Sequence, residues 1–438
     1  MITSPITRPI TSRIASAIAG ARVGGAANPL VWHAAYPDSD GVMQAQLIGS
    51  GTPTFNVDAG LLLPDYQGVY VAISEDTPPW HGARWSGGVA YGTDGSGDPL
   101  DPLPSLYGAP AYTNSLTYSN DLTQWSQVGT SVSALDAVGL TGAPNTATTV
   151  TDDNGAGYEY IQKNIAVSNN SDTHAIRVFI LKDSDETRYP EIQVVLAGGT
   201  GQQVRVQINT KTGAVVERGS IGTTAIEARD TGVFWELLAS VANNSTGNTT
   251  ASVYVWPAIT TAFGSAEVAA TGSCVIGNVE LHLNKTIAAV RGSAPIVTAA
   301  STVTTTAITD VYNSANWVDT SGGLYCEVTL QVAQNILSTF LDVSGSTFRL
   351  NDGTNTATAA WVTNTAYQLG IAWDASAGTM AINVDGTWSS NATYDGTLLA
   401  GALDIFRSPA GVGLIRNIKR YKASNLAAAK ALVDGDMP

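Results

Sequence analysis

The sequence predicts an all-β protein: two consecutive antiparallel β-sandwiches after a small N-terminal adaptor, with a short helix near the C-terminal end. Hydrophobic residues make up 44% of the 438 residues and charged ones only 13%, so the chain can bury large cores. Thr, Ser, Asn and Gly are abundant instead, and they favour strands and turns over long helices. Short apolar runs recur along the chain with turn residues between them, which is typical of sandwiches.

Residues 1–25 are interpreted as an anchoring segment. Two prolines, Pro5 and Pro9, favour an extended start, and Ser12 could cap a short helix after them. The segment carries an apolar stripe and three arginines that precede the first acidic residue: Ile10, Ile14, Ile18, Arg8, Arg13 and Arg22. Such a helix is too short to be stable alone. It is either a frayed tail or a segment that becomes ordered against a partner or symmetry mates.

Residues 26–110 are expected to form a small adaptor rich in Gly, Pro and aromatic residues. Strands are predicted over 54–57 and 68–73. The run from Asp94 to Asp98 begins like a calcium loop, with oxygen-bearing side chains at its first, third and fifth positions. A calcium loop has Gly at its sixth position and Glu at its twelfth, where this run has Pro and Ser, so a plain turn is favoured.

Residues 111–293 are predicted to form the first sandwich. Residues 175–181 are apolar enough for a central strand, and 203–208 alternate with their apolar side chains facing inward. A turn and a returning strand at 214–217 complete a hairpin. Further strands are expected at 233–239 and 251–256.

Residues 294–422 are predicted to repeat this pattern as the second sandwich. Its expected strands are 323–332, 338–343, 347–350, 367–373, 379–384 and 413–421. The remaining residues, 423–438, are expected to form a helix over 425–433 and a tail. Ser424 or Asn425 would cap the helix, and Gly435 would end it.

The charge balance and the cysteines exclude several function classes. With 36 acids and 21 bases the net charge is −15, which disfavours nucleic acid as a partner. No run approaches the roughly 18 apolar residues of a membrane span, and no secretory signal is recognisable, so we expect a chain that is made and assembled in a cytoplasm. Two cysteines are too few for a disulfide framework, and Cys326 is expected to be buried and inert.

No catalytic motif is present, so we expect no enzymatic activity. The sequence lacks a Gly-x-Ser-x-Gly elbow, a phosphate loop and the common zinc motifs, and its four histidines are scattered. Glycosidases need two carboxylates across the scissile bond. In laminarinase-like sandwiches these alternate along one strand, and the corresponding strand here offers only Glu327. The acidic runs 152–154 and 183–186 are interpreted as loops rather than calcium sites, and no cofactor is expected.

Aromatic residues are the better functional lead. A sugar-binding site needs a flat ring for the pyranose face and planar polar groups for the hydroxyls. Five aromatic residues near predicted loops and turns are the candidate ligand-binding residues: Trp80, Trp85, Tyr91, Trp361 and Trp388. Three others lie within apolar patterns and are expected in the core: Trp125, Trp235 and Trp373.

One stretch carries a family resemblance. Residues 113–125 read Thr-Asn-Ser-Leu-Thr-Tyr-Ser-Asn-Asp-Leu-Thr-Gln-Trp. This phrase resembles the opening of a carbohydrate-binding-module-like jelly roll in tail-fibre, tailspike and other appendage proteins of tailed bacteriophages. Later segments of that module are similar to residues 147–153, 160–167 and 179–182 of this chain. Its last strand is more loosely similar to residues 277–281. Residues 296–422 resemble the concanavalin A-like (laminin G-type) sandwich of the same proteins.

The resemblance implies a structural virion protein, a tail fibre or other surface fibre, that contacts host-surface polysaccharide during adsorption. It further implies attachment to other virion proteins through the N-terminal segment and a homo-oligomer, expected to be a trimer. The depolymerase activity of enzymatic tailspikes usually resides in a β-helix, which this sequence lacks. Two alternatives stay open: a purely structural capsid-decoration or baseplate protein, and a concanavalin-like glycanase.

Overall fold

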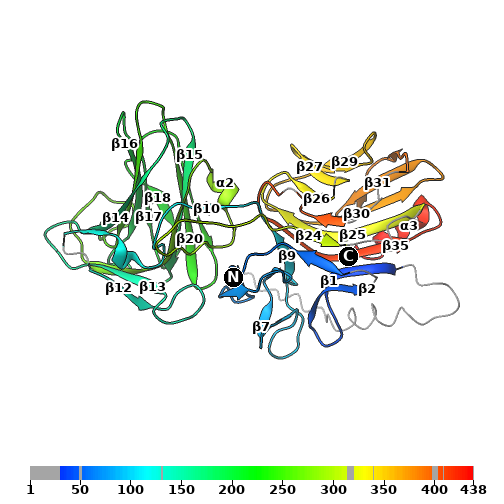
Figure 1. Cartoon of the computed structure of the whole chain (residues 1–438), viewed down its shortest axis with the longest axis horizontal. Coiled ribbons are helices and arrows are strands. Elements are labelled where there is room, and N and C mark those ends of the chain that lie inside the picture. The colour runs from blue at the N-terminus through cyan, green and yellow to red at the C-terminus, as the bar shows by residue number, and fades with distance from the viewer. Residues whose placement is uncertain are drawn as a thin grey trace, which may run out of the picture.

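The structure is a computed structural model that describes residues 30–48, 52–129, 132–312, 320–338, 340–396, 403–407 and 409–437. Two β-rich lobes lie side by side, with the first strands of the chain beneath the second lobe (Figure 1). Antiparallel pairing connects the strands throughout both lobes, so the predicted all-β fold class is confirmed. The predicted anchor residues lie outside the described residues: Arg8, Ile10, Arg13, Ile14, Ile18 and Arg22.

The first sandwich consists of two six-stranded sheets. One has the order β11-β14-β21-β16-β17-β18: Ser126–Val128, Tyr160–Ala166, Thr250–Trp256, Glu191–Ala197, Gln202–Ile208 and Val215–Glu217. The other has the order β12-β13-β22-β15-β20-β19: Val132–Ala137, Ala147–Asp152, Gly272–His282, Thr173–Leu181, Phe234–Ala242 and Thr224–Asp230. Strands adjacent in a sheet are mostly not adjacent in sequence, which is the jelly-roll manner of building a sandwich.

Strand alternation builds the core of this sandwich. Val204, Val206 and Ile208 on β17 are fully buried, as predicted from their spacing. The predicted central strand is β15, which pairs with β20 on one side and β22 on the other. Leu116 and Trp125 also lie in this core, so the family-like stretch is mainly a packing element.

The second sandwich has a ten-stranded and a seven-stranded sheet. The first follows the path β2-β1-β35-β25-β30-β31-β32, with β33, β9 and β6 attached: Met43–Ile48, Leu30–Pro37, Gly413–Lys422, Ser321–Leu330, Ala366–Asp374, Thr379–Val384, Thr387–Trp388, Ala392–Thr393, Ser105–Gly108 and Trp80–His81. The second has the order β29-β28-β27-β26-β34-β24-β3: Thr356–Ala360, Thr347–Asn351, Leu341–Ser344, Asn335–Leu337, Leu403–Ile405, Asp310–Tyr312 and Pro53–Phe55.

Five strands of the predicted adaptor, β1, β2, β3, β6 and β9, belong to these two sheets, so this part of the chain does not form a fully separate unit. Strand β1 pairs with β35, placing Trp32 opposite Arg420, and β3 pairs with β24, placing Phe55 opposite Asp310. Strand β9 also pairs with β35. The local pattern of 26–110 could not reveal these partners, because they lie hundreds of residues away in sequence. In the described residues, three two-stranded sheets stay outside the large ones: the hairpins β4–β5 (Leu61–Pro64, Tyr70–Ile73) and β7–β8 (Arg84–Ser86, Val89–Tyr91), and the long-range pair β10–β23 (Thr113–Asn114, Val303–Thr304).

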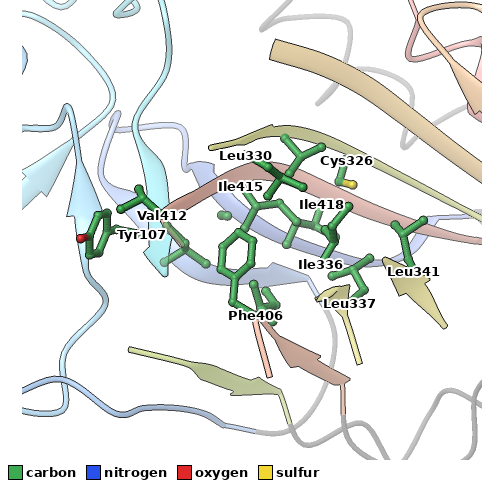
Figure 2. Close-up of a cluster of buried hydrophobic side chains, with 14 of the residues drawn as sticks. Tyr107, Cys326, Leu330, Ile336, Leu337, Leu341, Phe406, Val412, Ile415 and Ile418 are labelled. Carbon is green, nitrogen blue, oxygen red and sulfur yellow. The ribbon is translucent and has the colours of Figure 1, made fainter. Parts of the chain in front are cut away.

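Side chains from both sheets, including those of β9, fill the second core (Figure 2). Phe406 points into the middle of this cluster. Two glycines make room for its ring, since a Cβ added at Gly108 or Gly413 would lie only 2.2 or 2.5 Å from a ring atom. Cys326 is fully buried here, and burial raises the pKa of its thiol well above the usual value, as expected for an inert cysteine.

A buried arginine joins the first sandwich to the linker that leads into the second. Arg177 on β15 is fully buried, and its Nη2 donates to Glu280 Oε2 at 2.7 Å and to the Ala294 carbonyl at 2.9 Å. Its Nη1 donates to the Ser293 carbonyl at 2.5 Å and lies 3.4 Å from Glu236 Oε1. The amide of Ala294 in turn donates to the Tyr107 hydroxyl on β9 at 2.8 Å. We call this arginine, its two glutamates and the linker carbonyls the junction.

Three short helices complete the described structure: a 3-10 turn (Leu122–Gln124), the four-residue α2 (Ile287–Val290) in the linker and α3 (Leu426–Asp434) near the end of the chain. The Asn425 side chain accepts the Ala428 amide and caps α3, as predicted. Val433 on α3 packs against Gly323 and Gly370 of the ten-stranded sheet, so the helix covers part of the outer face of that sheet. Among the described residues, no helix has the length and apolar character needed to cross a membrane.

Candidate functional site

Two of the predicted sugar-binding tryptophans are buried. Trp80 is 3% exposed and Trp361 9% exposed, and both belong to the core of the second sandwich. Neither ring presents a face on which a sugar could stack, so these two candidates are corrected to core residues. Both follow turn-like sequences, and the local pattern could not reveal that β6 and the segment after β29 pack inward.

The other three predicted aromatic residues are partly exposed, but they are engaged by neighbours and do not come together. Trp85 packs against the core, and Tyr91 lies under the Arg84 guanidinium, whose central carbon is 4.3 Å from the ring centroid. Trp388 donates from Nε1 to Asp434 Oδ1 at 2.7 Å, and Lys430 lies over its ring at 4.9 Å. The last two contacts hold Trp388 against α3.

A different group of aromatic residues gathers on the first sandwich. We call its outward surface over β14, β21 and β16 the aromatic face; it comprises Tyr158, Tyr160, Gln162, Gln193, Tyr254 and Trp256. Its sheet lies on the side away from the second sandwich, whereas the sheet with β15 and β20 faces the linker (Figure 1). The aromatic face is therefore not covered by the rest of the described chain.

Strand alternation points these residues outward. Ile161 and Val255 are fully buried in the core, so their neighbours in sequence point to the opposite side of the sheet. The register sets Gln162 opposite Tyr254, and Tyr254 opposite Gln193. A row of alternating amide and aromatic side chains thus crosses three strands.

The rings form a contiguous cluster. Tyr160 and Trp256 have ring centroids 4.2 Å apart, and Tyr254 lies 5.4 Å from Tyr160 and 6.2 Å from Trp256. Tyr158 adds an edge contact to Trp256 at 6.4 Å and is 42% exposed. Contacts of this kind hold the rings in fixed orientations while leaving them partly accessible.

The polar groups of the aromatic face retain hydrogen-bonding capacity. In the part of the chain that the structure describes, the hydroxyls of Tyr160 and Tyr254 make no hydrogen bond, and neither does the side-chain amide of Gln162. Gln193 donates from Nε2 to Gln203 Oε1 at 3.1 Å, which orients its amide. Half-exposed planar groups with unused donors and acceptors can bind the hydroxyls of a ligand.

An ion-pair cluster bounds the aromatic face on its β17 side. Arg205 and Arg218 donate from Nε to the two oxygens of Glu191, at 2.7 and 3.0 Å, and both also contact Glu267. Glu191 is fully buried, and burial raises the pKa of its carboxyl although both arginines oppose the shift. This cluster is internally satisfied and supports the sheet beneath the rings.

The alternation of residues in β21 is a sequence signal for this site. In β21, Val253 and Val255 alternate with Tyr254 and Trp256, so one face of the strand is aliphatic and the other aromatic. An aromatic face on a strand whose other face fills the core indicates an exposed platform. The expectation that Trp125 and Trp373 are core residues is confirmed, whereas Trp235 is only half-buried and donates to the Thr210 carbonyl at 2.7 Å.

The three acidic runs form hydrogen-bonded loops. Asp94 Oδ1 accepts the amides of Ser96 and Asp98 at 2.9 and 3.0 Å. Asp152 accepts the Asn154 and Glu159 amides, and burial raises the pKa of its carboxyl to about 6. Asp183 binds Arg188 and Thr210. Among the described residues, no three His, Cys, Asp or Glu side chains are grouped as metal ligands.

Comparisons with known proteins give only remote structural likenesses. No protein-family model and no curated protein matches the sequence. The chain is similar to domains LG4-5 of the mouse laminin alpha1 chain, with 12% identity and a TM-score of 0.20 over 64% of this chain and 90% of that one. It is also similar to the CBM22-1-CBM22-2 tandem of Paenibacillus barcinonensis Xyn10C, with 8% identity and a TM-score of 0.25 over 72% and 99%.

A third likeness is to the extracellular region of zebrafish Gpr126/Adgrg6, with 10% identity and a TM-score of 0.17 over 65% of this chain and 37% of that one. Scores this low carry no argument about ligands or partners. The candidate site therefore rests on the residues of the aromatic face alone.

Proposed function

We propose that the chain is a surface protein of a tailed-bacteriophage particle, a tail fibre or other surface fibre, and that it binds glycan on the host cell. The observation that carries the glycan part is the aromatic face, where stacked half-exposed rings lie beside amides with unused hydrogen-bonding groups. The resemblance of residues 113–125 and 296–422 to phage appendage proteins supports the virion part. Such a protein would be assembled with other virion proteins in the bacterial cytoplasm.

The chemistry of the aromatic face suits a saccharide. A pyranose ring presents an apolar face of C–H groups, which stacks on Tyr and Trp rings, and a rim of hydroxyls, which pair with amides. An open face of this kind binds weakly at each copy. Several copies on one particle would raise the overall avidity without new contacts, which is why we propose a homo-oligomer, a trimer, attached through residues 1–25.

We further propose that the chain binds glycan without cleaving it. Both carboxylate oxygens of Glu327 accept hydrogen bonds, Oε2 from Arg416 Nε at 2.8 Å and Oε1 from Asn417 Nδ2 at 2.9 Å. A carboxylate held in this way is poorly placed to protonate a leaving group. If host polysaccharide were degraded by the wild-type chain and not by Glu327→Gln, the glycanase alternative would replace this proposal.

A glycan array probed with the full chain tests the binding. We expect the wild-type chain to bind a subset of bacterial surface polysaccharides. Trp256→Ala should lose most of this binding signal, and Tyr66→Ala should keep it unchanged. Tyr66 is a matched control because it is 41% exposed and lies outside the aromatic face. No binding above background would favour a purely structural decoration or baseplate protein.

The particle and the oligomer need separate tests. Gold-labelled antibody against the chain should mark the surface of purified virions, and unlabelled particles would contradict the virion assignment. Light scattering should give a trimer for the full chain and a smaller species after removal of residues 1–25. A monomer in both cases would refute the proposed oligomer.

A further inference from the structure

A hollow lies on the outer face of the ten-stranded sheet, in the second sandwich. It has a volume of about 340 Å³, near the lower end of the range for small-ligand sites. We call it the cleft; polar and charged residues are six of its ten lining residues: Ser105, Glu327, Thr329, Gln368, Asp385 and Arg416. They come from β9, β25, β30, β35 and the turn after β31, so the sheet itself positions them.

Strand pairing fixes the floor of the cleft. Glu327 on β25 lies opposite Gln368 on β30 and opposite Arg416 on β35. The neighbour of Glu327 in sequence, Val328, is 2% exposed and packs in the core, so Glu327 faces outward. Three planar polar groups therefore stand side by side on one surface of the sheet.

Several groups in the cleft have no partner within the chain. Among the residues that the structure describes, the side chains of Ser105, Thr329 and Gln368 make no hydrogen bond. Ser105 is only 6% exposed, so its hydroxyl is a nearly buried polar group on the wall of a hollow. Thr329 and Gln368 are half-exposed, so the three side chains can offer hydrogen bonds to a polar ligand in the hollow.

The charged groups of the cleft are held in place. Arg416 donates from Nε to Glu327 and from Nη1 to the Leu103 carbonyl, each at 2.8 Å. Asp385 Oδ1 accepts a hydrogen bond from the backbone N–H of Gln368 at 2.8 Å. The backbone N–H of Asp385 donates to the backbone carbonyl of Gln368 at 3.0 Å. This pairing occupies one oxygen of Asp385, so the other is available to a ligand.

We propose that the cleft is a second saccharide-binding site, separate from the aromatic face, and that it accepts a sugar unit without negative charge. Asp385, Gln368 and Ser105 bind the hydroxyls of that unit, and the Glu327–Arg416 pair holds the floor of the cleft rigid. Two carboxylates against one guanidinium leave the cleft net negative, and the chain as a whole has a charge of −15. A uronate or sialate is therefore disfavoured by like-charge repulsion.

The test isolates the cleft from the aromatic face. The starting protein is the full chain with the double substitution Tyr160→Ala and Trp256→Ala, which disables the aromatic face; we call it the background variant. It is applied to an array of uncharged, amine-bearing and uronate-bearing oligosaccharides. The strongest uncharged probe is then titrated by calorimetry. We expect uncharged or amine-bearing probes to bind and matched uronates to bind about tenfold more weakly.

Variants then locate the binding. Asp385→Asn keeps an oxygen that accepts from the backbone N–H of Gln368 but removes the negative charge. It should weaken the affinity for the uncharged probe about fivefold and reduce the difference in affinity between uncharged probes and uronates. Gln368→Ala should weaken the uncharged probe about threefold and leave that discrimination unchanged. Glu75→Gln, an exposed acid outside the cleft, should change neither measurement.

The possible outcomes separate this inference from the proposed function. If the background variant binds no uncharged glycan, or if Asp385→Asn and Gln368→Ala leave its binding unchanged, the cleft is not a saccharide site. The aromatic face could still bind in that case. If the wild-type chain loses binding in Asp385→Asn but not in Trp256→Ala, the cleft stands and the aromatic face fails.

Discussion

The junction and the aromatic face lie on the two opposite sheets of the same sandwich, and an arginine held between two glutamates lies in the first and borders the second. At the junction, Arg177 is fully buried, and the hydrogen bonds of its two Nη groups go to glutamates and carbonyls of the chain itself. Beside the aromatic face, Arg205 and Glu191 are also paired, but the Tyr254 hydroxyl and the Gln162 side-chain amide on the face itself make no hydrogen bond in the described structure.

The difference separates structural polarity from polarity that can serve a ligand. A buried group whose partners all come from the chain stabilises one conformation, and removing it leaves unpaired charges behind. A half-exposed group without partners contributes little to folding and is available for binding. The junction should therefore determine the stability of the chain, and the aromatic face should determine its affinity.

The largest expected effect is on stability, from Arg177→Met. Burial alone would lower the pKa of Arg177, but Glu280 and Glu236 raise it above its usual value, so the guanidinium stays charged beside these glutamates. Without the arginine, both glutamates would be buried without this partner, and we expect a loss of about 3–5 kcal/mol in the free energy of unfolding. Chemical denaturation measures this loss.

A second arginine pair provides the control. Arg349 binds Asp342 through two hydrogen bonds, at 2.9 and 2.6 Å, and its side chain is 37% exposed. Arg349→Met should therefore cost no more than about 1 kcal/mol. Equal losses for the two variants would contradict the distinction between the junction and a pair whose arginine is exposed.

The next effect concerns affinity. Trp256→Ala removes a ring of the aromatic face, and loss of stacking should weaken glycan binding by about 1–2 kcal/mol, or roughly five- to thirtyfold. The Trp256 side chain is half-exposed, so the free energy of unfolding should fall by less than for Arg177→Met. Calorimetry and denaturation on the same samples check both statements, and a stability loss as large as that of Arg177→Met would place Trp256 in the core instead.

A pH effect is expected where β1 joins the second sandwich. His33 is 4% exposed, and burial, with Lys419 nearby, lowers its pKa to about 4; Asn417 Oδ1 lies 3.2 Å from its Nε2. The unfolded chain therefore binds more protons than the folded one between pH 6.5 and about 4, so stability falls as the pH is lowered through that window.

The variant His33→Gln removes this titration. It should reduce the acid-induced loss of stability between pH 7 and 4 by about 1–3 kcal/mol. Denaturant melts at several pH values measure the difference. The same pH dependence in the wild type and the variant would show that His33 does not limit the stability of the chain in acid.

The smallest expected effect concerns Trp388. Asp434→Ala removes the acceptor for Trp388 Nε1 and for Asn383 Nδ2, and it should cost about 0.5–1.5 kcal/mol because Asp434 is exposed. Glycan affinity should not change, since Trp388 packs against α3 and lies outside both proposed sites. A gain in affinity would return Trp388 to the list of ligand-binding residues.

The sequence was sufficient for the fold class because alternation is a local property. The β17 hairpin and the cap of α3 could be predicted from a few neighbouring residues. The membership of β1 and β3 in the second sandwich could not, because each pairs with a strand more than 250 residues away. Trp80 and Trp361 were misplaced for the same reason, since tertiary packing and not the turn beside them decides their exposure.

The aromatic face was within reach of sequence analysis only in part. Tyr254 and Trp256 show their shared face by spacing, but their contact with Tyr160 depends on the pairing of β14 with β21 across about 90 residues. The cleft is further from reach, because its walls come from five separate segments of the chain.

The most direct test of the account is a crystal structure of the full chain with a glycan selected on the array. We predict a sugar ring stacked on Tyr254 or Trp256, with its hydroxyls bound by Gln162 or Gln193. Glycan density at the junction, or on the Trp85–Tyr91 hairpin with the aromatic face empty, would contradict the account.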